Sequence, residues 1–118
     1  MLTQVESGQV VVKTATIANG ASLSDAIDCA VARLGRITLP AAWTAAALTF
    51  QVSPDGTNWF NLYDAAGTEY TAQAAASRAV IIPVADFLSV RYLKVRSGTS
   101  GAPVAQGAER ALTLSLVP

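Results

Sequence analysis

The spacing of turn residues is the feature that most constrains how this chain folds. Clusters of Pro, Gly, Asn and Asp recur about every 10–12 residues, and the segments between them alternate polar and apolar side chains. Alternation with a period of two is typical of half-buried β-strands. Units that alternate strands with helices need a longer repeat, so the spacing favours an antiparallel sandwich or barrel.

The pattern predicts an all-β fold: a single antiparallel β-sandwich, jelly-roll-like, with about eight strands and little helix. In residues 48–53 we expect Leu48, Phe50 and Val52 to face the core and the polar residues between them to face solvent. We expect one helical turn in 84–90, a loop in 98–107, and an irregular loop or single turn in the alanine-rich 41–47, which is too short for an independent helix. The predicted strands are residues 9–17, 25–31, 34–39, 48–53, 59–63, 69–72, 78–83, 91–97 and 109–117.

The length of 118 residues predicts one domain with a sizeable core. We assign residues 9–118 to this domain and interpret the polar residues 1–8 as an N-terminal arm that reaches a neighbouring subunit. Charged residues are only 14% of the chain, and eight basic residues balance eight acidic ones. A protein with few charges and no net charge tends to associate and to be poorly soluble as a monomer, so the composition favours a subunit of an assembly.

The same charge balance argues against nucleic acid as a partner, because no basic run offers an electrostatic footprint. No membrane partner is expected either. The longest apolar stretch is far short of a membrane span, and the N-terminus lacks the pattern of a signal peptide. We therefore expect the protein to be made in the cytoplasm.

The residues available for catalysis are few. The chain has no histidine, which excludes Ser-His-Asp and Cys-His arrangements, and Cys29 is its single cysteine. We interpret Cys29 as a buried thiol, because its close neighbours are small or apolar and no cation lies within two residues. Asp55 and Asp64 fall at turns, where local backbone hydrogen bonding is their usual role, and the loop lacks the alternating acids of a calcium site. We therefore predict that the chain is not an enzyme and that it has no catalytic residue, cofactor or metal site.

Aromatic residues are the first candidates for contacts with a partner. On the strand 59–63, Trp59 and Tyr63 share one face, and Phe60 shares the other with Leu62. We expect Phe60 and Leu62 to face the core, which leaves Trp59 and Tyr63 either as an exposed aromatic platform or as further core residues. Trp43 is either a plug beneath a loop or an anchor on a partner.

Basic residues on the strand 91–97 are the second group of candidates. Lys94 and Arg96 share a face with Tyr92. This face is either a solvated strand surface or an edge that meets an acidic neighbour.

Two long segments resemble a known group of proteins. The runs PAAWTAAALTFQVSPDGTNWFNLYDAAGTEYT and VRYLKVRSGTSGAPVAQGAERALTLSL resemble small virion structural proteins of tailed bacteriophages and prophages. The likeness extends from about Ile17 to Leu116, and its more specific part is the loop RSGTSGAPVAQGAER. It carries no established site residue onto this chain.

The resemblance implies a non-enzymatic bacteriophage virion protein. Within that class we expect a capsid decoration or cement protein that binds the assembled head, with the major capsid protein as its main partner. We also expect a homo-oligomer, with a trimer as the working hypothesis, and location in the virion. The alternative is a β-sandwich module of the tail, collar or fibre, with carbohydrate binding through the platform of Trp59 and Tyr63.

Overall fold

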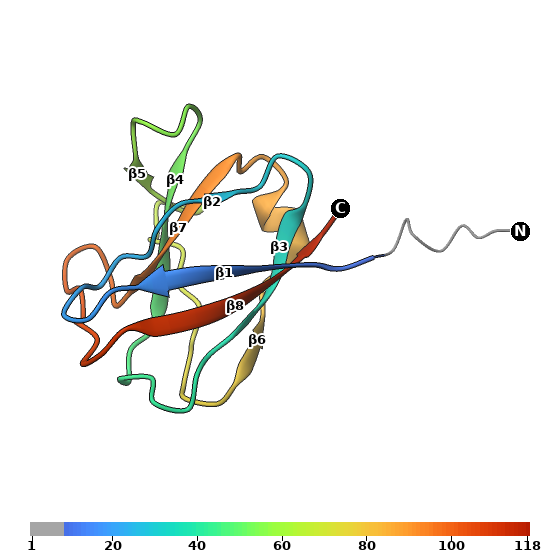
Figure 1. Cartoon of the computed structure of the whole chain (residues 1–118). Coiled ribbons are helices and arrows are strands. Elements are labelled where there is room, and N and C mark those ends of the chain that lie inside the picture. Colours follow the sequence, from blue (N-terminus) through green and yellow to red (C-terminus); the bar gives the residue numbers. More distant parts are fainter. Residues whose placement is uncertain (1–8) are drawn as a thin grey trace, which may run out of the picture.

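The computed structural model describes residues 9–118, which form two antiparallel four-stranded sheets packed face to face (Figure 1). The first sheet has the strand order β1-β8-β3-β6, and the second has the order β2-β7-β4-β5. The elements are β1 (Val11–Ile17), β2 (Ile27–Asp28), β3 (Arg33–Thr38), β4 (Leu48–Ser53), β5 (Phe60–Asn61), β6 (Ala79–Ile81), the 3-10 turn η2 (Val84–Phe87), β7 (Tyr92–Ser97) and β8 (Arg110–Val117).

The strand pairings follow the pattern of one long hairpin that has been rolled up. β1 pairs with β8, β2 with β7, β3 with β6 and β4 with β5, all antiparallel. Rolling the hairpin brings β3 against β8 and β4 against β7, which completes the two sheets. This connectivity is that of a jelly roll. The predicted all-β antiparallel sandwich of jelly-roll type is confirmed.

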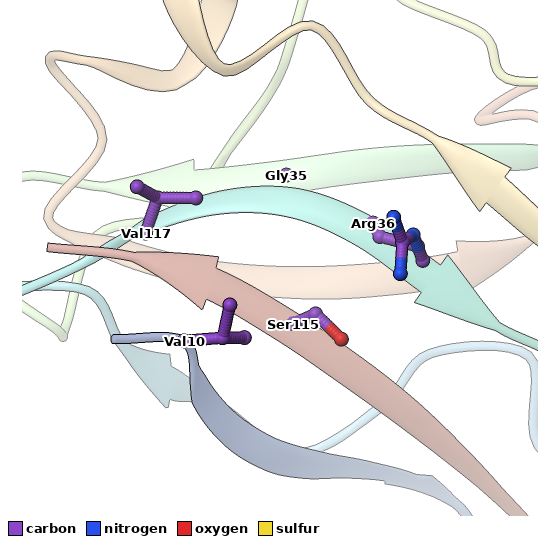
Figure 2. A pocket seen from close by; sticks show the side chains of 5 residues that line it. All are labelled: Val10, Gly35, Arg36, Ser115 and Val117. Atoms are coloured by element: carbon purple, nitrogen blue, oxygen red, sulfur yellow. The ribbon is translucent and has the colours of Figure 1, made fainter. Parts of the chain in front are cut away.

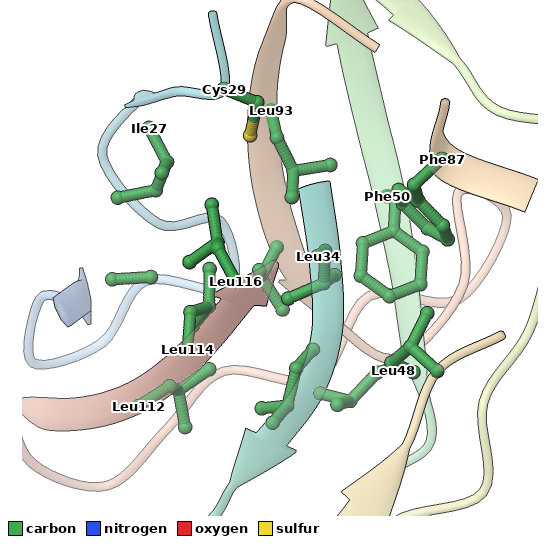
Figure 3. Packing of buried hydrophobic residues seen from close by; sticks show 14 of the residues in the cluster. Ile27, Cys29, Leu34, Leu48, Phe50, Phe87, Leu93, Leu112, Leu114 and Leu116 are labelled. Carbon is green, nitrogen blue, oxygen red and sulfur yellow. The ribbon is translucent and has the colours of Figure 1, made fainter. Parts of the chain in front are cut away.

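The core lies between the two sheets and is built from alternate residues of each long strand (Figure 3). On β8, Leu112, Leu114 and Leu116 are fully buried, as the alternation of this strand predicts. They pack towards the second sheet, where Phe50 and Leu93 are also fully buried. Each such side chain contributes about 1.5–3 kcal/mol relative to an exposed one. The sandwich is therefore held together by the inward faces of its central strands.

Cys29 follows β2 and points into this core (Figure 3). Its burial confirms the interpretation as a buried thiol. Burial raises the pKa of the Cys29 thiol, because the thiolate loses its hydration.

Four predicted strands are shorter than expected. In the first sheet, the segment 78–83 forms only the three-residue β6, and the other three belong to the second sheet. The segment 25–31 forms only the two-residue β2, and 59–63 forms only the two-residue β5. The segment 69–72 makes isolated bridges, Tyr63 with Glu69 and Leu48 with Ala72, in place of a strand. All three lie at the margins of the second sheet, where a short strand exposes few unpaired backbone groups.

The predicted facing of β4 is wrong at two polar positions. Thr49 and Ser53 were expected to face solvent, yet both are buried. The Thr49 hydroxyl donates a 2.7 Å hydrogen bond to the carbonyl of Gly98, and Ser53 Oγ accepts one of 2.8 Å from the Gly56 N–H. Loops therefore cover the outer side of β4, and they satisfy the hydroxyl groups that they bury.

The predicted helical turn in 84–90 is confirmed as η2, which places Phe87 in the core. The Phe87 ring meets Phe50 edge-on at 5.2 Å and Tyr70 edge-on at 5.4 Å between centroids. Such edge-to-face arrangements are the preferred geometry of aromatic pairs. The Tyr70 hydroxyl donates a 2.7 Å hydrogen bond to the Asp86 carboxylate, so η2 is tied to the segment that carries Tyr70.

Tyr70 is expected to titrate at unusually high pH. Burial disfavours its phenolate, and the Asp86 carboxylate adds a hydrogen bond to the neutral phenol and repulsion of the phenolate, which together raise the pKa of Tyr70 to about 12. The pKa of Tyr70 is thus higher in the folded state than its ordinary value of 10.0. The resulting contribution to the free energy of unfolding is fully present below pH 10 and is lost as the pH rises from 10 to about 12. Tyrosinate absorbance, followed with circular dichroism, measures this titration. Tyr70→Phe should remove the late component, and an unchanged curve would contradict the assignment.

Candidate interaction surfaces

Four of the five predicted anchors gather around β5 and β7, on or beside the outer face of the second sheet. Lys94 and Arg96 lie on β7, Trp59 directly precedes β5, and Tyr63 follows it. β4 separates β5 from β7 and provides the ladder that sets their spacing. The fifth anchor, Trp43, lies elsewhere, in the loop between β3 and β4.

Arg96 is held in a buried ion pair. Arg96 Nη1 lies 3.2 Å from Glu69 Oε2, and the two side chains are only 8% and 15% exposed. Arg96 Nη2 donates a 2.7 Å hydrogen bond to Asn61 Oδ1, and the Glu69 carboxylate accepts hydrogen bonds from the Ser100 N–H. A solvated position for Arg96 is therefore wrong. The acidic neighbour that it meets is Glu69 of its own chain, brought across the sheet by the segment after β5.

Trp59 and Lys94 form a cation–π contact. The Lys94 ammonium lies 4.4 Å from the centroid of the Trp59 ring, and both residues are half-buried. Such contacts contribute about 0.5–1 kcal/mol where they remain partly exposed. One face of the indole is therefore occupied by a cation, and Trp59 does not present two free faces.

The turn before Trp59 is fixed by a single carboxylate. Asp55 Oδ1 accepts 2.8 Å hydrogen bonds from the N–H groups of Thr57 and Asn58, and Oδ2 accepts one of 2.7 Å from the Asn58 side-chain amide. These bonds stabilise the carboxylate and hold the pKa of Asp55 well below its usual range. Gly56 takes a φ of +81°, which glycine adopts without strain. Asp55 thus has the local role that the sequence indicated.

Tyr63 is 51% exposed, and Phe60 is 59% exposed. The expectation that Phe60 faces the core is wrong. Phe60 pairs with Val52 near the end of β4, and β5 is the last strand of its sheet, so no further strand covers the ring. The exposed aromatic groups of this region are therefore Tyr63 and Phe60, with Trp59 beside them and partly covered.

Trp43 is buried at 5% exposure, and its indole N–H donates a 3.3 Å hydrogen bond to the carbonyl of Ala46. Gln106 braces the same loop, because its side-chain oxygen accepts from the Thr44 N–H and its amide donates to the Thr44 carbonyl. This placement is that of a plug beneath a loop, one of the two alternatives for Trp43.

A second surface was not recognised from the sequence. The outer face of the first sheet exposes small, β-branched and apolar side chains. Among residues 9–118, Arg36 is its one exposed charged residue, since Arg33, opposite Val117, is half-buried and donates a hydrogen bond to the Leu88 carbonyl. A charge-poor patch of this kind is typical of contact with another protein. The members, which we call the first-sheet face, are Val10, Val12, Thr14, Thr16, Arg36, Thr38, Ala79, Ile81, Ala111, Thr113, Ser115 and Val117.

The register of the strands makes the first-sheet face continuous. Thr14 lies opposite Thr113, which lies opposite Thr38. A shallow pocket of about 110 Å³ lies beside Arg36, between Val10 and Val117 (Figure 2). The alternation within each strand predicts which side chains point outward. Only the strand order shows that the outward side chains of different strands lie next to one another.

Residues 9–118 contain no group of three or more His, Cys, Asp or Glu side chains placed to hold a metal ion. In the same residues, no helix has the length and hydropathy needed to cross a membrane. Comparisons of the chain with protein family models, curated proteins and solved structures found no match.

Proposed function

We propose that this chain is a non-enzymatic structural subunit of a bacteriophage virion, which binds the assembled head and stabilises it. The observation that carries the proposal is the first-sheet face, a broad surface whose one exposed charged residue among the described positions is Arg36. The resemblance of the sequence to phage virion proteins supports it. The jelly roll is also compatible with it, although capsid, lectin and cupin domains share this architecture.

The first-sheet face suits a flat protein surface that is itself poor in charge. Val12 and Ile81 would supply apolar contact, since they are 62% and 75% exposed. Arg36 would pair with a carboxylate of the major capsid protein, because a guanidinium covered by a partner needs an opposite charge. A subunit that binds only the assembled shell stabilises it by mass action, by about 2.7 kcal/mol per site when free subunit exceeds the Kd 100-fold.

The alternative is a module of the tail, collar or fibre that binds carbohydrate. The half-exposed Tyr63 favours it, because an exposed ring can stack on a sugar. Trp59 favours it less, because the Lys94 ammonium occupies one face of its ring.

The test compares virions made with and without this gene by electron microscopy and by heat-induced DNA release. We expect loss of regular density from the head surface and earlier release of DNA. Complementation with Arg36→Glu should fail to restore the density, whereas Arg91→Glu, a charge reversal directly before β7 and away from the first-sheet face, should restore it. An unchanged head would overturn the decoration role, and density lost from the tail or fibres would support the alternative.

A further inference from the structure

β1 is the longest exposed sheet edge in the described part of the chain. The other three edge strands, β2, β5 and β6, have two or three residues each, whereas β1 has seven. Short edge strands protect a sheet against unwanted pairing. β1 pairs with β8 on one side, and Figure 1 shows it lying along β8 at the margin of the first sheet.

Among the contacts formed within residues 9–118, the free side of β1 is closed at its C-terminal end only. The Thr16 carbonyl accepts a 3.1 Å hydrogen bond from the Asp25 N–H, and the Thr16 N–H donates one of 2.8 Å to Asp25 Oδ1. Thr16 therefore directs both backbone groups away from β8. Since backbone groups alternate along an antiparallel strand, Val12 and Thr14 direct theirs to the same side. No hydrogen bond formed within residues 9–118 engages those groups of Val12 or Thr14.

The one charged side chain of β1, Lys13, is hydrogen-bonded within the chain. Lys13 lies on the inward side of β1, and its ammonium donates a 2.8 Å hydrogen bond to the carbonyl of Asp28. An inward-pointing charge on an edge strand opposes pairing because an added strand would help to bury it, but here the Asp28 carbonyl already supplies the ammonium with a hydrogen bond. The side chains that flank the open part of β1 on the outer face are Val10 and Val12, which are 56% and 62% exposed.

We propose that β1 pairs antiparallel with β1 of a second copy of this chain, about a twofold axis at Val12. In this register Val12 lies opposite Val12 of the partner subunit, and Val10 lies opposite Thr14 of the partner subunit. The open backbone groups of Val12 then bond those of Val12 of the partner subunit, and those of Thr14 bond the backbone groups of Val10 of the partner subunit, reciprocally as a twofold contact requires. Apolar and β-branched cross-strand pairs of this kind are favourable.

The neighbouring register explains why the axis falls at Val12. An axis at Lys13 would place the two Lys13 side chains directly opposite each other, and like charges at opposed positions destabilise a strand pair. An axis at Val12 places Lys13 opposite Val11 of the partner subunit. The net charge of zero leaves no overall repulsion between copies. The pair would join two first sheets into one eight-stranded sheet with a continuous first-sheet face.

The test is sedimentation of the full chain over roughly 10 µM to 1 mM, because a contact made mainly by one strand edge is small and hence weak. We expect a concentration-dependent dimer. Val12→Lys should raise the dissociation constant at least tenfold, because two ammonium groups then meet at the axis. Ala111→Lys adds the same charge to the same face, on β8 and away from the edge, and should dimerise like the wild type.

A second measurement tests the register of the strand pair and shows whether a variant has lost the dimer because it has misfolded. Val12→Lys and Val12→Glu should each be monomeric and melt like the wild type, and a mixture of the two should form a heterodimer. A wild-type chain that stays monomeric, a trimer, a dimer unaffected by Val12→Lys, or a mixture that does not associate would each overturn the proposal. The proposed dimer does not depend on the proposed function, because dimerisation is measured on the isolated protein in the absence of phage heads.

Discussion

Replacing Gly98 by alanine is expected to destabilise the domain by about 3 kcal/mol or more, from backbone strain and overpacking together. Gly98 has a φ of +88°, and a Cβ placed there would lie 2.6 Å from the carbonyl oxygen of Ala102 and 2.7 Å from the nitrogen of Val104. Both contacts are with backbone, so no side-chain rotation relieves them. Relief requires the loop to move away from the end of β7.

That movement would break contacts on both sides of Gly98. Its N–H donates a 2.8 Å hydrogen bond to the Ala47 carbonyl, and its own carbonyl accepts the bond from the buried Thr49 hydroxyl. The Val104 N–H donates to the carbonyl of Ser97, which closes the loop onto β7. Gly98 thus fixes where the loop leaves the sheet.

Gly67 provides the matched control. Its φ is +86°, but a Cβ there would meet no atom within 4 Å. Gly67→Ala should therefore cost only the conformational term, about 1 kcal/mol. For a domain of this size the melting temperature should fall by roughly 12 °C in Gly98→Ala and by roughly 4 °C in Gly67→Ala. Equal shifts in the two variants would show that the close approach at Gly98 has no energetic effect.

The fold was predictable because its determinants are local. On β8, the alternation of Leu112, Leu114 and Leu116 with smaller residues marks a strand with one buried face, and the Pro-Asp-Gly turn after β4 marks a hairpin. These patterns depend on neighbours in sequence, so reading the chain alone recovers them. Most of the strands, the connecting turns and the 3-10 turn η2 followed from such patterns.

The surfaces were less predictable because they depend on chain segments that are distant in sequence. Arg96 alternates like a solvent-facing residue, and its burial follows from Glu69, which lies 27 positions earlier. Phe60 alternates like a core residue, but its strand ends the sheet and no neighbour covers it. The first-sheet face joins residues from both ends of the chain, so its continuity required the strand order.

Replacing Glu69 by alanine is expected to destabilise the domain by about 3 kcal/mol, because it leaves a charge without its partner in a buried position. Arg96 is 7% exposed in the wild-type chain, and its other side-chain contacts, Asn61 and Thr49, are uncharged. The Ser100 N–H also loses its acceptor. The melting temperature should fall by roughly 12 °C.

The exposed ion pair between Arg91 and Asp28 is the control, because both side chains are about half exposed. Arg91→Met should shift the melting temperature much less, since solvent screens this pair and hydrates the remaining carboxylate. Adding Arg96→Met to Glu69→Ala should recover part of the lost stability, because it removes the uncompensated charge that the first substitution created. If the losses of the two single variants simply add in the double variant, the Arg96–Glu69 contact contributes nothing, and the segment 69–72 is held over the second sheet by its backbone bridges alone.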